Sequence, residues 1–271
     1  MKNYLLPALA ALLLAFATTS TALAFGVGLT PSTVELEVQP GSRHRQVLRV
    51  KNFNPDKPIR LTISVADWTL DETGQVQLTP PEESERSASA WVNFSPSVLL
   101  LEPNATQEVI VDINTPLNLD KKGDHRSALI LSTVLPSKEK RAGTQGVWNR
   151  YQIASLFYAN VMPGKSEAKI TQATVHQPDA RKGYGLTFKI ENAGERHVRM
   201  EGTVALQDQT KKRIAEQPFQ AVLLNDQARE FSVEFDDLNL QPGDYDVLFD
   251  IKGEGKTIPL KVATSPVLSL P

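Results

Sequence analysis

Apolar and polar residues alternate along most of the chain, in short runs separated by turn residues. Val34–Val38 alternates valine and leucine with glutamate, and Phe231–Phe235 repeats the pattern in the second half. A period of two places every second side chain on one face, which is typical of a half-buried β-strand. Turn signals such as Pro40-Gly41 recur every ~8–12 residues, and no window carries a helical apolar stripe. The pattern predicts an all-β fold.

The runs fall into two groups, before and after the turn at Pro163-Gly164-Lys165-Ser166. The first group predicts strands at 34–38, 47–51, 60–65, 109–113, 128–135 and 152–162. The second group predicts strands at 169–175, 184–191, 198–206, 231–235, 245–251 and 257–262, the last two paired as a hairpin. We therefore expect one domain at residues 25–163, a second at 164–263, and a frayed tail at 264–271.

The first 24 residues are typical of a secretory signal peptide. Lys2 precedes the apolar run Leu5–Ala17, and Ala22-Leu23-Ala24 provides small residues before a cleavage site after Ala24. The run is shorter than the ~20 residues that span a bilayer. We expect an exported, periplasmic protein with no stable membrane insertion after signal cleavage.

Short motifs recur in the two halves. Asn52 corresponds to Asn192, and Gly123-Asp124-His125 corresponds to Gly243-Asp244-Tyr245. Asn52 and Asn192 are separated by more residues than Gly123 and Gly243 are. The first domain therefore has extra residues between Asn52 and Gly123, and we predict that they form an insertion at Asp71–Ser95. The repetition favours two copies of one sandwich.

Tyr245 follows a Pro-Gly turn at the start of a predicted strand, as a structural tyrosine corner requires. His125 occupies the matching place in the first half. It is interpreted as a structural substitute; the alternative is a pH-sensitive or catalytic imidazole.

Composition excludes several classes of chemistry. The 271 residues contain no cysteine and four scattered histidines, and 29 basic residues face 31 acidic ones. Cysteine-based disulfides, nucleophiles and metal sites are therefore excluded. The charge balance gives no overall basic field for nucleic acid. We predict no catalytic residues, no cofactor and no metal, and hence no enzyme.

The stretch Val27–Pro163 resembles the PapD-like periplasmic pilus and fimbrial assembly chaperones. The resemblance rests on Leu29-Thr30-Pro31-Ser32 through Val50-Lys51-Asn52, on Leu101–Val109, on Gly123–Pro136, and on Tyr151-Gln152-Ile153-Ala154 through Phe157-Tyr158 and Pro163. It implies two immunoglobulin-like β-sandwich domains in tandem, without catalysis. It also implies a protein client, pilin-like or another exported protein, bound by β-strand addition.

The corresponding edge would be the strand 152–162. One face of this strand carries the residues we expect to bind the client: Ile153, Ser155, Phe157, Ala159 and Val161. The other face carries Leu156, Tyr158 and Met162. A strand that is apolar on both faces either awaits a partner or is an ordinary buried strand, and both readings remain open.

The sequence departs from the family at the client's terminal carboxylate. The resemblance implies two cationic anchors, which align with Thr33 and Tyr158, and neither is a cation. We therefore assign no anchor role to these two residues.

A second hypothesis is a structural or adhesive module of the cell surface or envelope that binds wall polymer or protein partners. Val65-Ala66-Asp67-Trp68 fits such modules, with Trp68 or Trp91 stacking on sugar or, alternatively, buried in the core. Trp148, at the end of a polar loop, is either a partner contact or folds back on the sandwich.

Overall fold

The computed structural model describes residues 26–135, 148–176, 184–235, 243–261 and 266–270. The predicted signal peptide and most of the loop before Trp148 lie outside these ranges. Within them the regular secondary structure is all strand apart from one short 3-10 turn, η1 (Ser89–Trp91). The prediction of an all-β fold is confirmed. No helix in the described ranges is long and apolar enough to cross a membrane.

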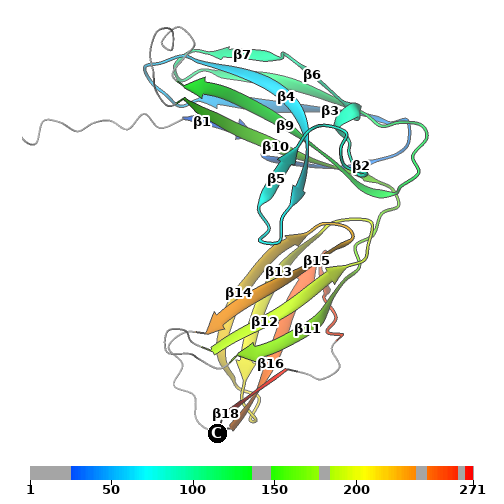
Figure 1. Ribbon diagram of the computed structural model, residues 1–271, viewed down its shortest axis with the longest axis vertical. Coiled ribbons are helices and arrows are strands. Elements are labelled where there is room, and N and C mark those ends of the chain that lie inside the picture. The colour runs from blue at the N-terminus through cyan, green and yellow to red at the C-terminus, as the bar shows by residue number, and fades with distance from the viewer. Residues whose placement is uncertain (1–25, 136–147, 177–183, 236–242, 262–265, 271) are drawn as a thin grey trace, which may run out of the picture.

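The first ten strands form one sandwich of two sheets (Figure 1). One sheet has the order β1 (Val27–Thr30), β3 (Arg43–Asn52), β8 (Thr106–Asn114), β6 (Val92–Ser95). The other has the order β2 (Thr33–Val38), β10 (Asn149–Val161), β9 (Gly123–Leu135), β4 (Ile59–Leu70), β5 (Val76–Thr79), with β7 (Val98–Leu101) also beside β4. Only the β2–β10 pair is parallel. The chain thus changes sheets between β1 and β2, at Pro31.

The remaining strands form a second sandwich. One sheet has the order β11 (Ala168–His176), β12 (Tyr184–Asn192), β15 (Gln227–Phe235). The other has the order β14 (Arg213–Leu223), β13 (Val198–Gln207), β16 (Gly243–Gly253), β17 (Lys256–Thr257), with β18 (Val267–Leu270) also beside β16. The two tandem sandwiches agree with the expected fold class.

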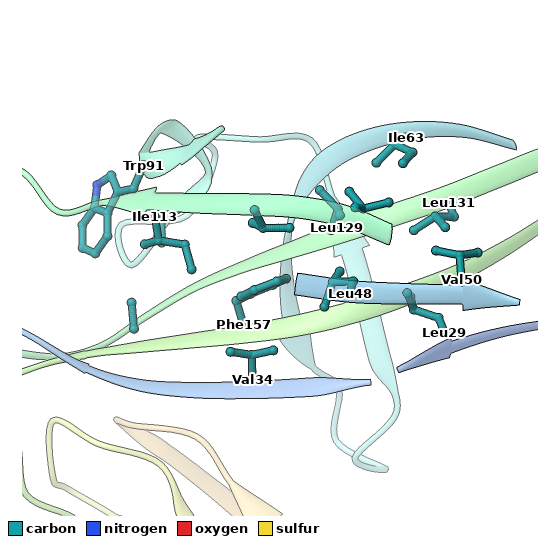
Figure 2. Close-up of a cluster of buried hydrophobic side chains, with 14 of the residues drawn as sticks. Leu29, Val34, Leu48, Val50, Ile63, Trp91, Ile113, Leu129, Leu131 and Phe157 are labelled. Atoms are coloured by element: carbon teal, nitrogen blue, oxygen red, sulfur yellow. The ribbon is translucent and has the colours of Figure 1, made fainter. Parts of the chain in front are cut away.

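The alternating strands supply a separate core to each sandwich. Figure 2 shows inward-pointing side chains of both sheets meeting in the first sandwich, among them Leu48, Leu129 and Phe157. Burying such side chains contributes ~1.5–3 kcal/mol each. Phe188 occupies a similar place in the second core, with its ring 5.3 Å from Phe219 and 5.7 Å from Phe231. Tyr245 is also buried there, although the turn before it lies outside the described residues.

Two expectations about the C-terminal segment hold only in part. The predicted hairpin with 257–262 is limited to β17, which pairs with Lys252 and Gly253, and to Ile258, whose N–H donates to the carbonyl of Ile251 at 2.8 Å. Beyond it, Leu260 turns to β11, where it forms a bridge with Ile170. The tail is not frayed throughout, because Val267 pairs with Asp246 and the rest of β18 continues that ladder. These pairings depend on neighbours that are distant in the sequence.

The first part of the predicted insertion lies between the two sandwiches. The hairpin of β4 and β5 extends from the first sandwich toward the second (Figure 1). At its turn, Gly74 lies against the guanidinium of Arg229 in β15. Close by, the Gln227 amide donates to the carbonyl of Leu70 at 3.0 Å. The last part of the predicted segment is β6, a regular strand of the first sandwich.

Candidate functional site

Strand β10 has two halves with different surroundings. From Leu156 to Val161 it lies between β9 and β2, so both of its edges are paired. From Asn149 to Ser155 it pairs with β9 alone among the described strands. We call this segment, Asn149–Ser155, the open edge. The division arises because the chain crosses to the other sheet at Pro31.

Hydrogen bonds fix the point where the open edge begins. The Ser155 hydroxyl donates to the carbonyl of Pro31 at 2.8 Å, and the Leu156 N–H donates to the carbonyl of Ser32 at 2.9 Å. Successive main-chain groups of a strand point to alternate sides. The N–H groups of Arg150, Gln152 and Ala154 therefore face the same side as that of Leu156. On the open edge these groups have no partner strand among the described residues.

The expected client-binding residues are divided by this arrangement. Ile153 lies on the open edge, half-buried against the first core. Ser155 is buried and bonded to Pro31. The backbone of Phe157, Ala159 and Val161 is already paired with β2, and these three side chains are buried in the core. The structure therefore corrects their expected role: they belong to the half that is a central strand.

The opposite face of β10 lies against the second sandwich. Tyr158 is buried there, with its ring 4.9 Å from Trp68 and 4.1 Å from His197. Leu224 of the second sandwich completes this apolar cluster. Burial raises the pKa of Tyr158 to about 12, so its hydroxyl stays neutral near pH 7. Met162 ends the same face and is partly exposed.

A cleft of about 310 Å³ opens at this junction. Thr33 and Tyr158, the positions where the family resemblance implies cations, both line it. The cationic side chains in the cleft come instead from the second sandwich, as Arg199 and Arg229. Arg199 is ion-paired with Glu35 of β2. Sequence reasoning missed both arginines, because their approach depends on how the two sandwiches are oriented.

The three tryptophans have different environments. Trp68 and Trp91 are buried, which agrees with the core interpretation and removes both from the surface. The ring centroids of Trp91 and His125 are 4.7 Å apart, with the two rings tilted by 37°. Trp148 is 52% exposed and immediately precedes the open edge.

A Ser-His-Asp set lies near the insertion, but it lacks the geometry of a catalytic triad. Asp67 accepts hydrogen bonds from the Ser87 hydroxyl at 2.6 Å and from Ser89. His125 instead contacts the carbonyl of Lys121 at 3.1 Å. A triad needs the carboxylate to orient the histidine and the histidine to contact the nucleophile. This carboxylate organises the loop. The described residues contain no group of three or more His, Cys, Asp or Glu side chains arranged to hold a metal.

No protein-family model and no curated protein matches the chain. Similar solved structures include the class 5 fimbriae chaperone CfaA, which is 12% identical and has a TM-score of 0.46, covering 91% of this chain and 99% of that one. They also include the CsuC–CsuE chaperone–tip adhesion subunit pre-assembly complex of Acinetobacter baumannii, at 13% identity, TM-score 0.43, and coverage of 86% and 98%.

The Salmonella enterica SafA pilin in complex with the SafB chaperone is similar too, at 12% identity and TM-score 0.44, covering 92% of this chain and 98% of that one. The likeness suggested by the sequence motifs thus reappears in solved fimbrial-chaperone structures over most of the chain. All three TM-scores are below 0.5, so these likenesses carry no argument about function. The fold rests on the strand pairing described above.

Proposed function

We propose that the protein is a non-enzymatic, periplasmic chaperone-like assembly protein that binds an exported client by β-strand addition at the open edge. The client is a pilin-like subunit or another exported protein. One observation carries the proposal: β2 covers β10 only from Leu156 to Val161, so the outward N–H groups of Arg150, Gln152 and Ala154 lie beside no other described strand. An exposed strand edge is a template for pairing with another chain.

The geometry favours a client strand that continues the line of β2. Because β2 ends its pairing at Thr33, a client strand can begin beside Ser155 and extend toward Asn149. The N–H and carbonyl groups of Arg150, Gln152 and Ala154 would form its ladder. Each main-chain hydrogen bond contributes a net ~0.5–1.5 kcal/mol, so several together provide substantial affinity.

Side chains on the open edge support a mainly backbone-driven interaction. Tyr151 and Ile153 are half-buried on the core side, whereas Arg150 and Gln152 are exposed on the other face. The open edge is therefore less apolar than a strand whose side chains alone would fill a gap in the client, so we expect main-chain hydrogen bonds to provide most of the affinity. Trp148 lies beside the edge with half of its surface exposed and is placed to add an apolar contact.

The alternative of a polymer-binding surface module is less well supported. Trp68 and Trp91, its candidate sugar-stacking residues, are both buried. The open edge has no role in that alternative, whereas strand addition depends on it.

A proline substitution tests the proposal. Gln152→Pro removes one outward N–H from the open edge without removing a hydrogen bond to β9, because Gln152 is on the outward-facing register. Gln152→Ala is the matched control that keeps the N–H. Each tagged variant is purified from the periplasm, and the associated proteins are identified by mass spectrometry.

We expect the wild type and Gln152→Ala to retain the same exported client, and Gln152→Pro to lose it while its circular dichroism is unchanged. Retention by a folded Gln152→Pro protein contradicts strand addition here. Pull-down by purified wall polymer, with no client in any sample, supports the surface-module alternative.

A further inference from the structure

The inward side chains of β10 are covered to different extents in the two halves of the strand. Beside β2, Phe157, Ala159 and Val161 are each 2% exposed. On the open edge, Tyr151 and Ile153 lie on the same face of the strand but are only half-buried. Both halves pair with β9. The difference therefore arises at the other edge of β10, where β2 accompanies only the first three residues.

Strand β2 supplies the inward cover where it is present. Its pairing with β10 places Val34 opposite Phe157 and Val38 opposite Val161. Both valines are buried in the first core, and Figure 2 shows Val34 beside Phe157. The row ends at Val34, because the preceding strand, β1, belongs to the other sheet. No described strand continues the row past Ile153.

The facing sheet also leaves apolar surface partly uncovered near the open edge. Strand β1 lies close to β10 across the core, although the two strands belong to different sheets. Its first residue, Val27, is half-buried, and both Val27 and Ile153 pack against the first core. Removing the rest of this apolar surface from water is favourable. An added strand obtains that gain only if its own inward side chains are apolar.

We propose that a bound client strand completes the first sandwich, with apolar side chains at alternate positions packed inward over Ile153 in line with Val34. This inference rests on the proposed function and names the class of client segment: a short strand with an apolar residue at every second position. Its pairing is limited to Asn149–Ser155, because β2 occupies the edge beyond. Main-chain hydrogen bonds provide the affinity, and the inward side chains provide the specificity.

The outer face of the open edge has the opposite requirement. Arg150 and Gln152 are exposed there, so client side chains on that face stay in water and can be polar. A slip of one residue exchanges the two faces of a strand. Only one of the two faces of an alternating client strand therefore fits inward, and the alternation also selects the register.

Affinity measurements on inward variants test this inference. The probe is the exported protein that co-purifies with the wild type, titrated into the full mature chain by calorimetry. Ile153→Ala keeps every main-chain group of the open edge and removes apolar surface from its inward face. We expect this variant to bind the probe at least about fivefold more weakly than the wild type does.

Leu36→Ala is the matched control for loss of stability. Leu36 is also half-buried against the first core, but it lies in β2 opposite Ala159, away from the open edge. Its affinity for the probe should stay within about twofold of the wild-type value. Equal weakening by Leu36→Ala and Ile153→Ala would assign the effect to general destabilisation and overturn the inference.

Gln152→Pro separates this inference from strand addition itself. If Gln152→Pro loses the probe while Ile153→Ala binds it with full affinity, strand addition stands and completion of the sandwich is overturned. Retention by a folded Gln152→Pro protein, or the absence of any co-purifying exported protein, overturns both. If Ile153→Ala does not fold, Ile153→Val removes one methylene and should bind about two- to threefold more weakly. Unchanged affinity of Ile153→Val then overturns the inference.

Discussion

Asn52 and Asn192 make equivalent buried hydrogen bonds in the two sandwiches. Each is 1% exposed and is the last residue of its strand. The Asn52 amide donates to the carbonyl oxygens of Lys57, Leu101 and Glu102. The Asn192 amide donates to the carbonyl oxygens of Arg196 and Leu224. Both side-chain oxygens accept the main-chain N–H two residues later. The repeated sequence motif thus corresponds to a repeated loop anchor.

Replacement of either asparagine by alanine should destabilise its sandwich. The change leaves several buried carbonyl groups unpaired, and each such group costs ~1–3 kcal/mol. We expect urea unfolding of Asn52→Ala and Asn192→Ala to show a free energy of unfolding lower by at least about 2 kcal/mol. Asn93→Ala, at an exposed position, is the control. A loss of less than about 0.5 kcal/mol in both variants would show that these anchors are not structural.

Gly123 permits the close approach of the two sandwiches. Its φ is +83°, and a Cβ placed on it would overlap the carbonyl oxygen of Glu195. Gly255 also has a positive φ, +77°, but nothing lies within 4 Å of a Cβ there. Alanine at either site costs about 1 kcal/mol through the backbone. We expect Gly123→Ala to lose clearly more stability than Gly255→Ala in thermal unfolding. Equal losses would show that the close contact between Gly123 and Glu195 is not needed for stability.

His125 should make the first sandwich sensitive to acid. Burial lowers the pKa of its imidazole below the ordinary 6.5. The unfolded chain then binds the proton more strongly than the folded chain. The stabilisation that comes from keeping His125 neutral is fully present above about pH 6.5. It is lost as the pH falls through the lowered pKa of the folded state. In urea unfolding from pH 8 to 4, His125→Gln should lose less stability than the wild type. If the free energies of unfolding of the two proteins fell equally between pH 8 and 4, His125 would not be the source of the acid sensitivity.

Phe157→Asp should prevent folding of the first sandwich rather than remove client binding selectively. Phe157 is 2% exposed in the core, and a carboxylate there replaces a large apolar side chain with an unpaired charge. We expect a loss of more than about 4 kcal/mol, seen as absent soluble protein or a lost near-ultraviolet dichroism signal. Gln152→Asp, on the exposed open edge, should fold normally. A folded Phe157→Asp protein would place this residue outside the core.

The regular part of the fold could be predicted from the sequence. Alternation placed strands within β2, β3, β8 and β15, because a period of two specifies a half-buried strand, and longer apolar runs placed strands within β9 and β10. Strand β14 was missed, since polar residues and Pro218, which an edge strand tolerates, interrupt its apolar residues. The four-residue strands β1 and β5 are too short to show a period.

The candidate site could be predicted only in part. The sequence identified the strand that becomes β10, and the apolar residues on both of its faces left its position open. Pairing with β2 on one half and with the second sandwich on one face resolves the question, and both depend on tertiary arrangement. Asp124 and His197 belong to different sandwiches, so no local pattern could indicate their contact.

Amide hydrogen exchange at the open edge tests strand addition most directly. The N–H groups of Arg150, Gln152 and Ala154 face outward, whereas those of Tyr151 and Ile153 face β9. The probe is the exported protein that co-purifies with the wild type, added to the labelled full mature chain. We expect its binding to slow exchange at the three outward groups by at least about tenfold and to leave the two inward groups, already protected, nearly unchanged. Unchanged exchange at Arg150, Gln152 and Ala154 in the complex would contradict the account.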